Sequence, residues 1–303
     1  MSKIELSVII PTHKRRDLLF FELDHIYMQK DVEFEVIVVN DIEEPDATDE
    51  ITSRYPEVIY IKDSSIQGPS NKHKAGYKIA KGDYLYMPDD DDYLIDNMFF
   101  RKAIDKMIQD PTLAFVSGQC HLSYEYEDII NNELKSHCTN MIGLITSSQY
   151  LQGFQNTIEK PWSTVSTIFS RKAFDDTDAM NMLEMSDSSM YMQVLFWGNA
   201  FIMKDVVAVY RIKAGSLTST LSLHFMQNVL RQKELFYKKS IGVLTSPKNF
   251  WYNQYVISYN FFPNLTRSNS WKLILWGLTH FHGSINLLRF LFFAFRRDVL
   301  KII

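Results

Sequence analysis

Residues 82–94 read GDYLYMPDDDDYL, so four consecutive aspartates directly follow a short apolar segment that is typical of a buried strand. Adjacent like charges repel, and an unpaired carboxylate is costly to bury, so such a cluster is tolerated where solvent or a cation neutralises it. Carboxylate oxygens suit Mg²⁺ or Mn²⁺, which usually also carry substrate phosphates. Two interpretations stay open on these residues alone: a divalent cation site, and a solvated acidic turn that caps the next helix through Asp92 or Asp96.

Strand-like and helix-like segments alternate around this stretch. Short apolar runs predict strands, and apolar residues at helical spacing predict helices between them. The predicted strands are 6–11, 35–39, 58–61, 84–87 and 114–117, and the predicted helices are 16–29, 46–54, 70–80 and 96–109. This alternation predicts an α/β fold with a doubly wound, mostly parallel sheet flanked by helices, whose ligands bind at the carboxyl ends of the strands.

Polar residues follow three of these predicted strands directly. They are Thr12-His13, Asn40-Asp41 and the run from Asp89 to Asp92, and we expect them to converge at one edge of the sheet. The sequence has no GxxxxGK[ST] loop and no GxGxxG loop, which argues against a P-loop or a dinucleotide site. It also has no GxSxG nucleophile elbow. The predicted site therefore depends on carboxylates.

Length and cysteine content set the broad class. The chain has 303 residues, of which 46% are hydrophobic, enough for one large domain or two. Its two cysteines, Cys120 and Cys138, form no CxxC pair, which predicts a reducing compartment and buried thiols. The first residues run straight into the strand at 6–11 without the pattern of a signal peptide, so we expect a cytoplasmic protein.

Charge is unevenly distributed along the chain. From Gln227 onward eleven basic residues face two acidic ones, so this tail is near +9 and the rest of the chain near −13. Such a basic arm predicts an anionic partner, either a membrane or a nucleic acid.

The end of the tail is aromatic and basic. Its apolar run, residues 285–295, is interrupted by Arg289 and is far shorter than the roughly 20 residues that span a bilayer. On a helix, His282, Asn286, Arg289 and Arg296 fall near one face, which is typical of a helix lying in a membrane interface. The alternative is a helix that packs on the domain or on a second copy of the chain.

Several blocks resemble, in order, the family 2 glycosyltransferases with the GT-A fold. In the first half the similar blocks are 6–15 (LSVIIPTHKR), 38–41 (VVND), 68–76 (GPSNKHKAG) and 82–92 (GDYLYMPDDDD). In the second half they are 167–174 (TIFSRKAF), Ser186-Asp187 eleven residues before Gly198, and 209–216 (VYRIKAGS). Each motif is weak by itself, but their joint order and spacing over residues 4–220 are specific.

The resemblance implies a divalent cation, Mn²⁺ or Mg²⁺, at the acidic stretch. Asp91 matches the family's metal ligand, and Asp89 assists it. Asp89 and Asp90 are also expected to hold the ribose or diphosphate of the donor, which leaves Asp92 to cap the next helix. Sugar transfer needs the leaving diphosphate to be stabilised, and a bound metal supplies this.

The resemblance also implies a nucleotide pocket. The aspartate that matches Asp41 hydrogen-bonds uracil in the family, and Pro11 and Thr12 line the base pocket. We add His13 and Lys72 to the predicted nucleotide-binding residues. Asn40 replaces the family's first aspartate, so the base itself stays open.

The acceptor side needs a base to deprotonate the attacking hydroxyl. Asp187 matches the family's general base, with simple helix capping as the alternative and Glu184 as the nearest other carboxylate. Trp162 is expected to stack on an acceptor sugar or to be a buried tryptophan. Arg211 and Lys213 are predicted to contact the acceptor or the diphosphate, and a solvated face is the alternative for both.

These inferences predict a metal-dependent inverting glycosyltransferase that transfers a hexosyl or N-acetylhexosaminyl group. The donor is a nucleotide sugar, expected to be UDP-linked, and the acceptor is a glycan or lipid-linked glycan of a cell-surface polysaccharide. Residues 1–220 form the GT-A domain, divided into a nucleotide half (1–120) and an acceptor half (121–220), and 221–303 form a helical extension.

The extension is predicted to meet an anionic membrane surface, peripherally on the inner face of the plasma membrane, or to allow a homo-oligomer; no nucleic acid partner is expected. Two other functions stay open. One is a sugar-nucleotide-forming nucleotidyltransferase, although the loop after residue 11 lacks the glycines such an enzyme needs. The other is an inactive scaffold that binds glycan or membrane.

Overall fold

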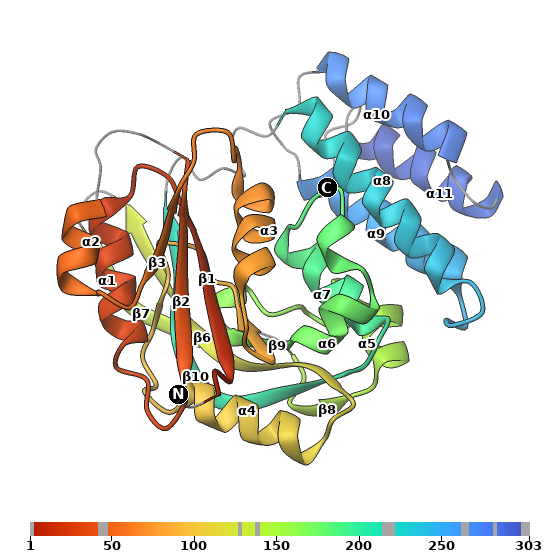
Figure 1. Ribbon diagram of the computed structural model, residues 1–303. Coiled ribbons are helices and arrows are strands. Elements are labelled where there is room, and N and C mark those ends of the chain that lie inside the picture. Colours follow the sequence, from red (N-terminus) through yellow and green to blue (C-terminus); the bar gives the residue numbers. More distant parts are fainter. Residues whose placement is uncertain are drawn as a thin grey trace.

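A mixed sheet covered by helices forms the larger part of the molecule in this computed structural model, and four C-terminal helices pack beside it (Figure 1). The structure describes residues 3–41, 48–126, 129–136, 140–213, 222–261, 267–280 and 284–297. Within these residues the sheet has ten strands, eight of them in the order β3-β2-β1-β4-β9-β6-β10-β5. The predicted α/β fold is confirmed.

The first half of the sheet is parallel, as the sequence predicts. It contains β1 (Leu6–Thr12), β2 (Phe34–Asn40), β3 (Ile59–Lys62) and β4 (Tyr84–Tyr86). Helices α1 (Arg16–Ile26) and α2 (Thr48–Arg54) cover one face, and α3 (Pro69–Ile79) covers the other (Figure 1). β1 and β2 are buried almost throughout because both faces are covered.

Alternate residues of the central strands enter two separate cores. Val8 and Ile10 pack with the side chains of α1, whereas Ile9 packs on the side of α3. Helix α3 approaches β1 so closely that a Cβ on Gly76 would lie 2.4 Å from the Ile9 side chain. The polar residues that follow β1 and β2 are therefore held on a rigid support.

The second half of the sheet is mixed and was largely unpredicted. Its strands are β5 (Tyr93–Leu94), β6 (Leu113–Tyr126), β7 (Ile129–Ser136), β8 (Gly143–Ile145), β9 (Thr167–Ser170) and β10 (Asn199–Lys213). β9 is antiparallel to both β4 and β6, and β10 runs parallel to β6. β6 pairs antiparallel with β7, which follows it in the chain.

Helices and short turns complete this half. They are α4 (Phe99–Gln109), α5 (Ser147–Gly153), α6 (Arg171–Asp176), α7 (Asp187–Leu195), and the 3₁₀ turns η1 (Thr164–Ser166) and η2 (Ala179–Asn181). Helix α4 begins three residues later than predicted because the Asp96 carboxylate accepts the Met98 N–H at 2.9 Å and forms a turn there. Cys120 is buried, as predicted, whereas Cys138 lies outside the described residues.

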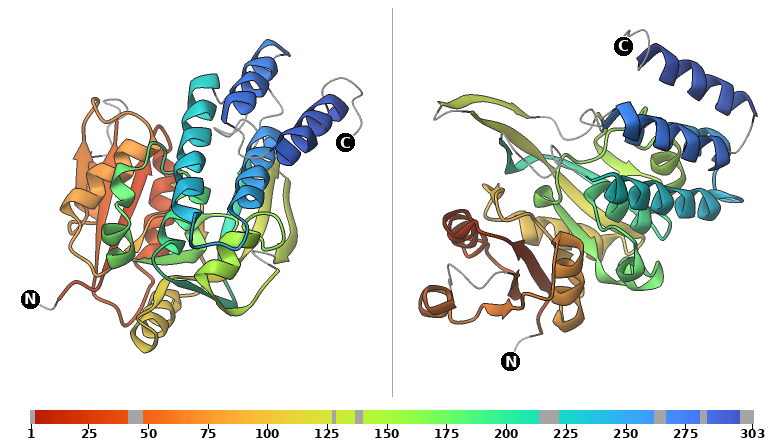
Figure 2. Two further views of the ribbon diagram at one scale, coloured as in Figure 1. Left: turned by 90° about the vertical axis from the view of Figure 1, so that its right-hand side faces the viewer. Right: turned by 90° about the horizontal axis from the view of Figure 1, so that it is seen from above.

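The C-terminal helices have an aromatic core of their own. They are α8 (Leu223–Ser240), α9 (Pro247–Phe261), α10 (Arg267–His280) and α11 (Ser284–Phe295), and they lie away from α1 and α2 (Figure 2). Trp251, Tyr255 and Phe290 are fully buried among them. The domain boundary near residue 220 falls outside the described residues and stays a prediction.

The residues on the buried and exposed faces of helix α11 differ from those predicted. Asn286, assigned to a polar outer face, is buried and donates to the Lys248 carbonyl at 3.0 Å. The outer side of α11 exposes four large apolar side chains, Ile285, Leu288, Phe292 and Phe295. We call these four residues the α11 apolar face. Among the described helices, none is long and apolar enough to cross a membrane.

One buried charge gives a prediction about stability. Lys233 of α8 lies in the interior, its amino group 3.4 Å from the Gln254 carbonyl oxygen, and burial lowers its pKa from 10.5 to about 7. Between these two values the unfolded chain holds a proton that the folded chain lacks, so the free energy of unfolding rises with pH in this window. Replacing this lysine by an apolar residue removes the free-energy cost of burying its amino group.

We expect Lys233→Met to raise the free energy of unfolding by about 3 kcal/mol at pH 6.5 and by much less near pH 10. Urea denaturation at both pH values measures the difference. Lys238→Met, at an exposed position of the same helix, is the control and should change little at either pH. An equal effect of Lys233→Met at both pH values would contradict the burial of a titrating amine.

Candidate active site

Three carboxylates of the loop after β4 lie together. Asp89, Asp91 and Asp92 can each direct one oxygen to a common point, and these oxygens are within 4.8 Å of one another. Burial and the charges of Asp187, Asp91 and Asp90 raise the pKa of Asp89 well above its ordinary value. Burial and the neighbouring aspartates also raise the pKa of Asp92. A divalent cation would relieve this crowding, so the donor set fits Mn²⁺ or Mg²⁺.

Asp92 does not cap the following helix, and that prediction was wrong. Its side chain is 1% exposed and accepts hydrogen bonds from the Ser163 hydroxyl at 2.9 Å and the Arg211 N–H at 2.9 Å. It therefore ties the acidic loop to β10 and to the segment before η1. Local sequence could not reveal this, because Arg211 lies more than a hundred residues away.

Asp90, which is not one of these three carboxylates, contacts the end of β1. It accepts from the Thr12 hydroxyl at 2.7 Å and from the Arg15 guanidinium at 2.8 Å. The same guanidinium nitrogen also lies 2.8 Å from Asp91. Burial opposes the charge on Arg15, but Asp90 and Asp91 outweigh it and raise its pKa. Arg15 was not among the predicted site residues, although it ends the block 6–15.

Glu22 of α1 is a further carboxyl group near this loop. It is 1% exposed, and neither of its oxygens has a hydrogen-bond partner among the described residues. Burial, followed by the charges of Asp90 and Asp92, raises its pKa well above 4.5. Its surroundings therefore disfavour the charged form of Glu22.

The ends of β1 and β2 bring together four predicted nucleotide-binding residues. The Asp41 carboxylate lies 2.7 Å from the His13 ring and 2.8 Å from the Lys72 amino group. Lys72 also donates to the Thr12 carbonyl at 2.7 Å. Burial acts to raise the pKa of Asp41, but hydrogen bonds from Lys72 and His13 outweigh it and lower the pKa. The Asp41 carboxylate is thus held at the end of β2, and β1, with Pro11 buried in it, lies between β2 and the strand that precedes the acidic loop.

Asp187 lies at the start of α7, as predicted. Ser186 caps the helix by accepting the Ser189 N–H, so Asp187 itself is not the capping residue. Its side chain is 32% exposed, and its charge is the strongest of those that raise the pKa of Asp89. Asp187 therefore lies beside the acidic loop.

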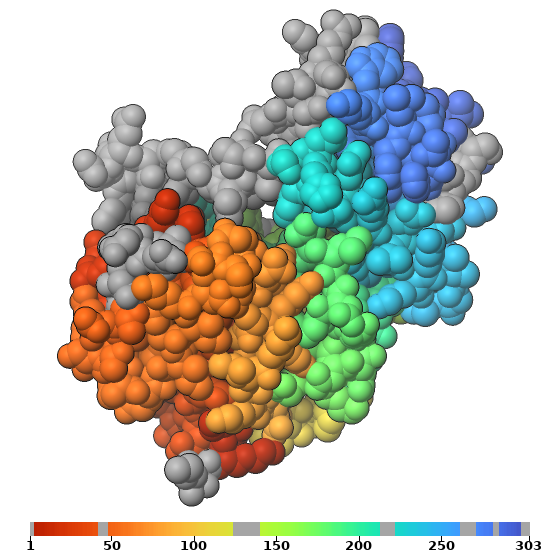
Figure 3. Space-filling model, turned by 45° about the horizontal axis from the view of Figure 1, so that its top comes forward, coloured from red at the N-terminus to blue at the C-terminus, as the bar shows by residue number. Residues whose placement is uncertain are grey.

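Glu184, the other nearby carboxylate, is occupied elsewhere. Its two oxygens lie 3.3 Å from the Ser70 hydroxyl and 3.3 Å from the Asn228 amide. Together with the bond from Lys74 to the Met182 carbonyl at 2.7 Å, this ties α3 to the segment before α7. The regions of α3 and α7 lie side by side in Figure 3. Glu184 is thus a structural link between helices.

The predicted acceptor residues are more widely spread. Trp162 is 38% exposed, and its ring lies 6.4 Å from that of Tyr210. The Arg211 guanidinium lies 4.7 Å from the ring of Phe21 and 4.7 Å from that of Tyr93. The Lys213 side chain lies outside the described residues. Acceptor contacts by these three residues stay predictions.

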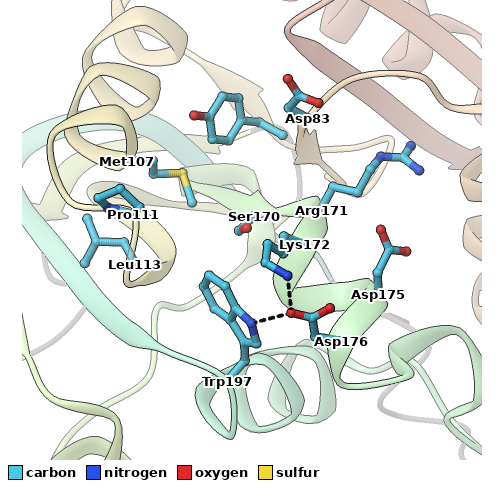
Figure 4. Close-up of a pocket in the computed structure, with 11 residues that line it drawn as sticks. Asp83, Met107, Pro111, Leu113, Ser170, Arg171, Lys172, Asp175, Asp176 and Trp197 are labelled. Carbon is cyan, nitrogen blue, oxygen red and sulfur yellow. Dashed lines mark hydrogen bonds and ion pairs between the residues drawn. The ribbon is translucent and has the colours of Figure 1, made fainter.

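A pocket of about 470 Å³ lies at the other end of β4. It is lined by Asp83 and Tyr84 at the start of that strand and by α6 and Trp197 (Figure 4). The Asp176 carboxylate accepts from Lys172 at 2.6 Å and from the Trp197 indole at 2.8 Å. The acidic loop follows the opposite end of β4, so this pocket is separate from the candidate active site.

The parallel half of the sheet ends in Asp41 and the acidic loop, and the mixed half supplies Asp187. This arrangement is that of the GT-A class of glycosyltransferase fold. Residues 7–175 match the model of glycosyl transferase family 2, which covers more than half of the chain, so the chain belongs to that family. The resemblance seen in the sequence is confirmed.

Individual relatives are distant. A curated protein of Haemophilus influenzae, described as an uncharacterized glycosyltransferase, is 29% identical over 111 residues, which is 37% of this chain and 37% of that protein. The match therefore spans little more than a third of that relative.

Solved structures share the fold. S. aureus TarS residues 1–349, in complex with UDP-GlcNAc, has a TM-score of 0.58 and 14% identity, covering 86% of this chain and 82% of that one. The mannosyltransferase PcManGT from Pyrobaculum calidifontis, in complex with GDP-Man and Mn²⁺, has a TM-score of 0.55 and 16% identity. The match covers 99% of this chain and 82% of that one.

Proposed function

We propose that this protein transfers a sugar from a nucleotide sugar to a hydroxyl group of a glycan acceptor. The observation that carries the proposal is that Asp187 lies close enough for its charge to act on Asp89, which shares a loop with Asp91 and Asp92. Such a site has one set of groups to stabilise the leaving diphosphate and a separate carboxylate to deprotonate the attacking hydroxyl.

The donor is proposed to be UDP-linked. Asp41 is the acceptor offered to the base, and Thr12, His13 and Lys72 surround it. The TarS and PcManGT complexes contain UDP-GlcNAc and GDP-Man, which supports a nucleotide-sugar donor without deciding the base. The transferred group is accordingly a hexosyl or N-acetylhexosaminyl group.

Each carboxylate then has a role. Asp89, Asp91 and Asp92 would hold Mn²⁺ or Mg²⁺, which supplies positive charge to the diphosphate. Asp187 accepts the proton of the acceptor hydroxyl. As it does so, the hydroxyl oxygen bonds to the anomeric carbon, and the bond from that carbon to the diphosphate breaks. Attack opposite the leaving group inverts the anomeric configuration. Trp162, Arg211 and Lys213 are proposed to orient the acceptor, a glycan or lipid-linked glycan of a cell-surface polysaccharide.

Product formation tests this proposal. The protein is incubated with Mn²⁺ and, in turn, UDP-, GDP- and CDP-linked sugars, and release of the nucleoside diphosphate is measured with and without glycan acceptors. A sugar-nucleotide-forming nucleotidyltransferase would instead release pyrophosphate from a nucleoside triphosphate and a sugar phosphate. An inactive scaffold would bind ligands and release neither product.

The tail is proposed to hold the protein peripherally on the inner face of an anionic membrane, with homo-oligomerisation as the alternative. The α11 apolar face is flanked by Arg289 and Arg296, both exposed, which suits an interface between acyl chains and anionic headgroups. Each basic residue near such a surface contributes about 1 kcal/mol, and salt screens this contribution.

We expect the double variant Leu288→Glu/Phe292→Glu to lose binding to phosphatidylserine-containing vesicles, because both side chains are exposed on α11 and glutamate is repelled there. Truncation is a poorer test, because removing α11 would also remove Phe290 from the shared core. Co-sedimentation at rising salt measures binding, and Leu235→Glu, at an exposed position of α8, is the control. Unchanged binding by the double variant, or none by the wild type, would contradict the membrane role.

A further inference from the structure

The segment 160–164 runs between Asp187 and the acidic loop, and it was not part of the predicted site except for Trp162. We infer that Lys160 is a positioning residue that fixes Asp187 relative to the acidic loop; this inference rests on the proposed function. Its amino group lies 3.8 Å from the Asp187 carboxylate, and its side chain is 16% exposed.

Backbone contacts fix the amino group in place. Lys160 donates to the carbonyl of Pro161 at 2.7 Å and to that of Trp162 at 2.8 Å. It also lies 5.8 Å from the ring centroid of Tyr191, in the same helix as Asp187. The cation is therefore held by its surroundings, and its position does not depend on Asp187 alone.

The residues that follow connect this cation to the acidic loop. The Ser163 hydroxyl donates to Asp92 at 2.9 Å, and the Thr164 hydroxyl donates to the Met87 carbonyl at 2.6 Å. The Tyr191 hydroxyl donates to the Ser163 carbonyl at 3.1 Å. Five consecutive residues thus contact α7 at one end and the loop that follows β4 at the other.

Electrostatics explain why a cation is useful at this point. Asp187 lies beside several carboxylates, and its charge is the strongest of those acting on Asp89. Without a nearby positive charge, repulsion would favour rotamers that turn Asp187 away from the loop. Lys160 offsets this repulsion from a side chain that its own backbone contacts hold still. A base displaced by about 1 Å can lose about 10²-fold in rate, so such fixing has a measurable effect.

We expect Lys160→Met to lower kcat by about 10-fold to 100-fold while the donor KM and the UDP Kd stay within about twofold of wild type. Lys160→Arg should recover most of kcat, because it restores the cation. Lys172→Met, which breaks an exposed ion pair at the far end of β4, is the matched control and should leave kcat unchanged. Circular dichroism and thermal melts verify that each variant is folded.

A second step separates this role from the proposed function. In an Asp187→Asn background, Lys160→Met should have no further effect on kcat, because the carboxylate it positions is gone. Overturning results are a wild-type kcat in Lys160→Met, no recovery in Lys160→Arg, additive losses in the double variant, or a parallel loss of UDP affinity. Absence of any sugar transfer by the wild-type protein would instead refute the proposed function.

Discussion

Asp187→Asn is expected to lower kcat by about 10²-fold to 10⁴-fold while the affinity for the nucleotide sugar stays nearly unchanged. The reason is that a general base acts on the acceptor hydroxyl in the transition state and makes no contact with the bound nucleotide. Asparagine keeps the size and the position at the start of α7, where Ser186 provides the cap. The substitution therefore removes the proton acceptor without removing a helix cap.

Steady-state kinetics with the best donor and acceptor of the product screen, with calorimetry for donor affinity, measures this effect. Asp178→Asn is a suitable control, because Asp178 is exposed and has a left-handed backbone that asparagine also tolerates. If Asp187→Asn kept the wild-type kcat, the base would have to be another residue. Glu184 would then be tested next, although its bonds to Ser70 and Asn228 argue against that role.

The sequence could predict the parallel half of the fold because its signals are local. β1 and β2 are continuous apolar runs, since helices cover both of their faces, and polar residues mark where each strand ends. The convergence of Thr12, His13 and Asp41 follows from that topology, and Lys72 reaches them from α3. In open α/β sheets, ligands bind at the carboxyl ends of the strands, and this rule predicted where the candidate site lies.

The mixed half could not be predicted in the same way. β6 and β10 have register shifts along their pairing, and β4 is bordered by a strand that follows about eighty residues later and runs antiparallel to it. The contacts of Asp92 and Lys160 involve Arg211 and Asp187, which the fold of this half brings to the acidic loop. No local periodicity encodes such contacts, and for Asp92 a capping role was the plausible local interpretation.

The acidic loop gives the other large expected effect. Asp91→Asn should abolish the part of UDP affinity that depends on Mn²⁺, because it removes one of three carboxylates that can meet at a common point. Asp91 is a cleaner target than Asp92, whose carboxylate also binds Ser163 and the Arg211 backbone. Arg15 retains its bond to Asp90 in the variant, so the loop should keep its conformation.

Calorimetric titration of UDP, once with Mn²⁺ and once with EDTA, separates the metal-dependent part of the UDP affinity from the metal-independent part. For the wild type we expect tighter binding with Mn²⁺; for Asp91→Asn we expect at least 10-fold weaker binding with Mn²⁺ and no change in EDTA. Asp83→Asn, at the opposite end of β4 and paired with Lys3, is the control and should behave as wild type. If Asp91→Asn kept the Mn²⁺-dependent affinity, Asp91 would not be a metal ligand. If the wild type bound UDP equally with and without Mn²⁺, the acidic loop would act on the donor without a cation. Arg15, which bonds to Asp90 and Asp91, would then be the residue to examine next.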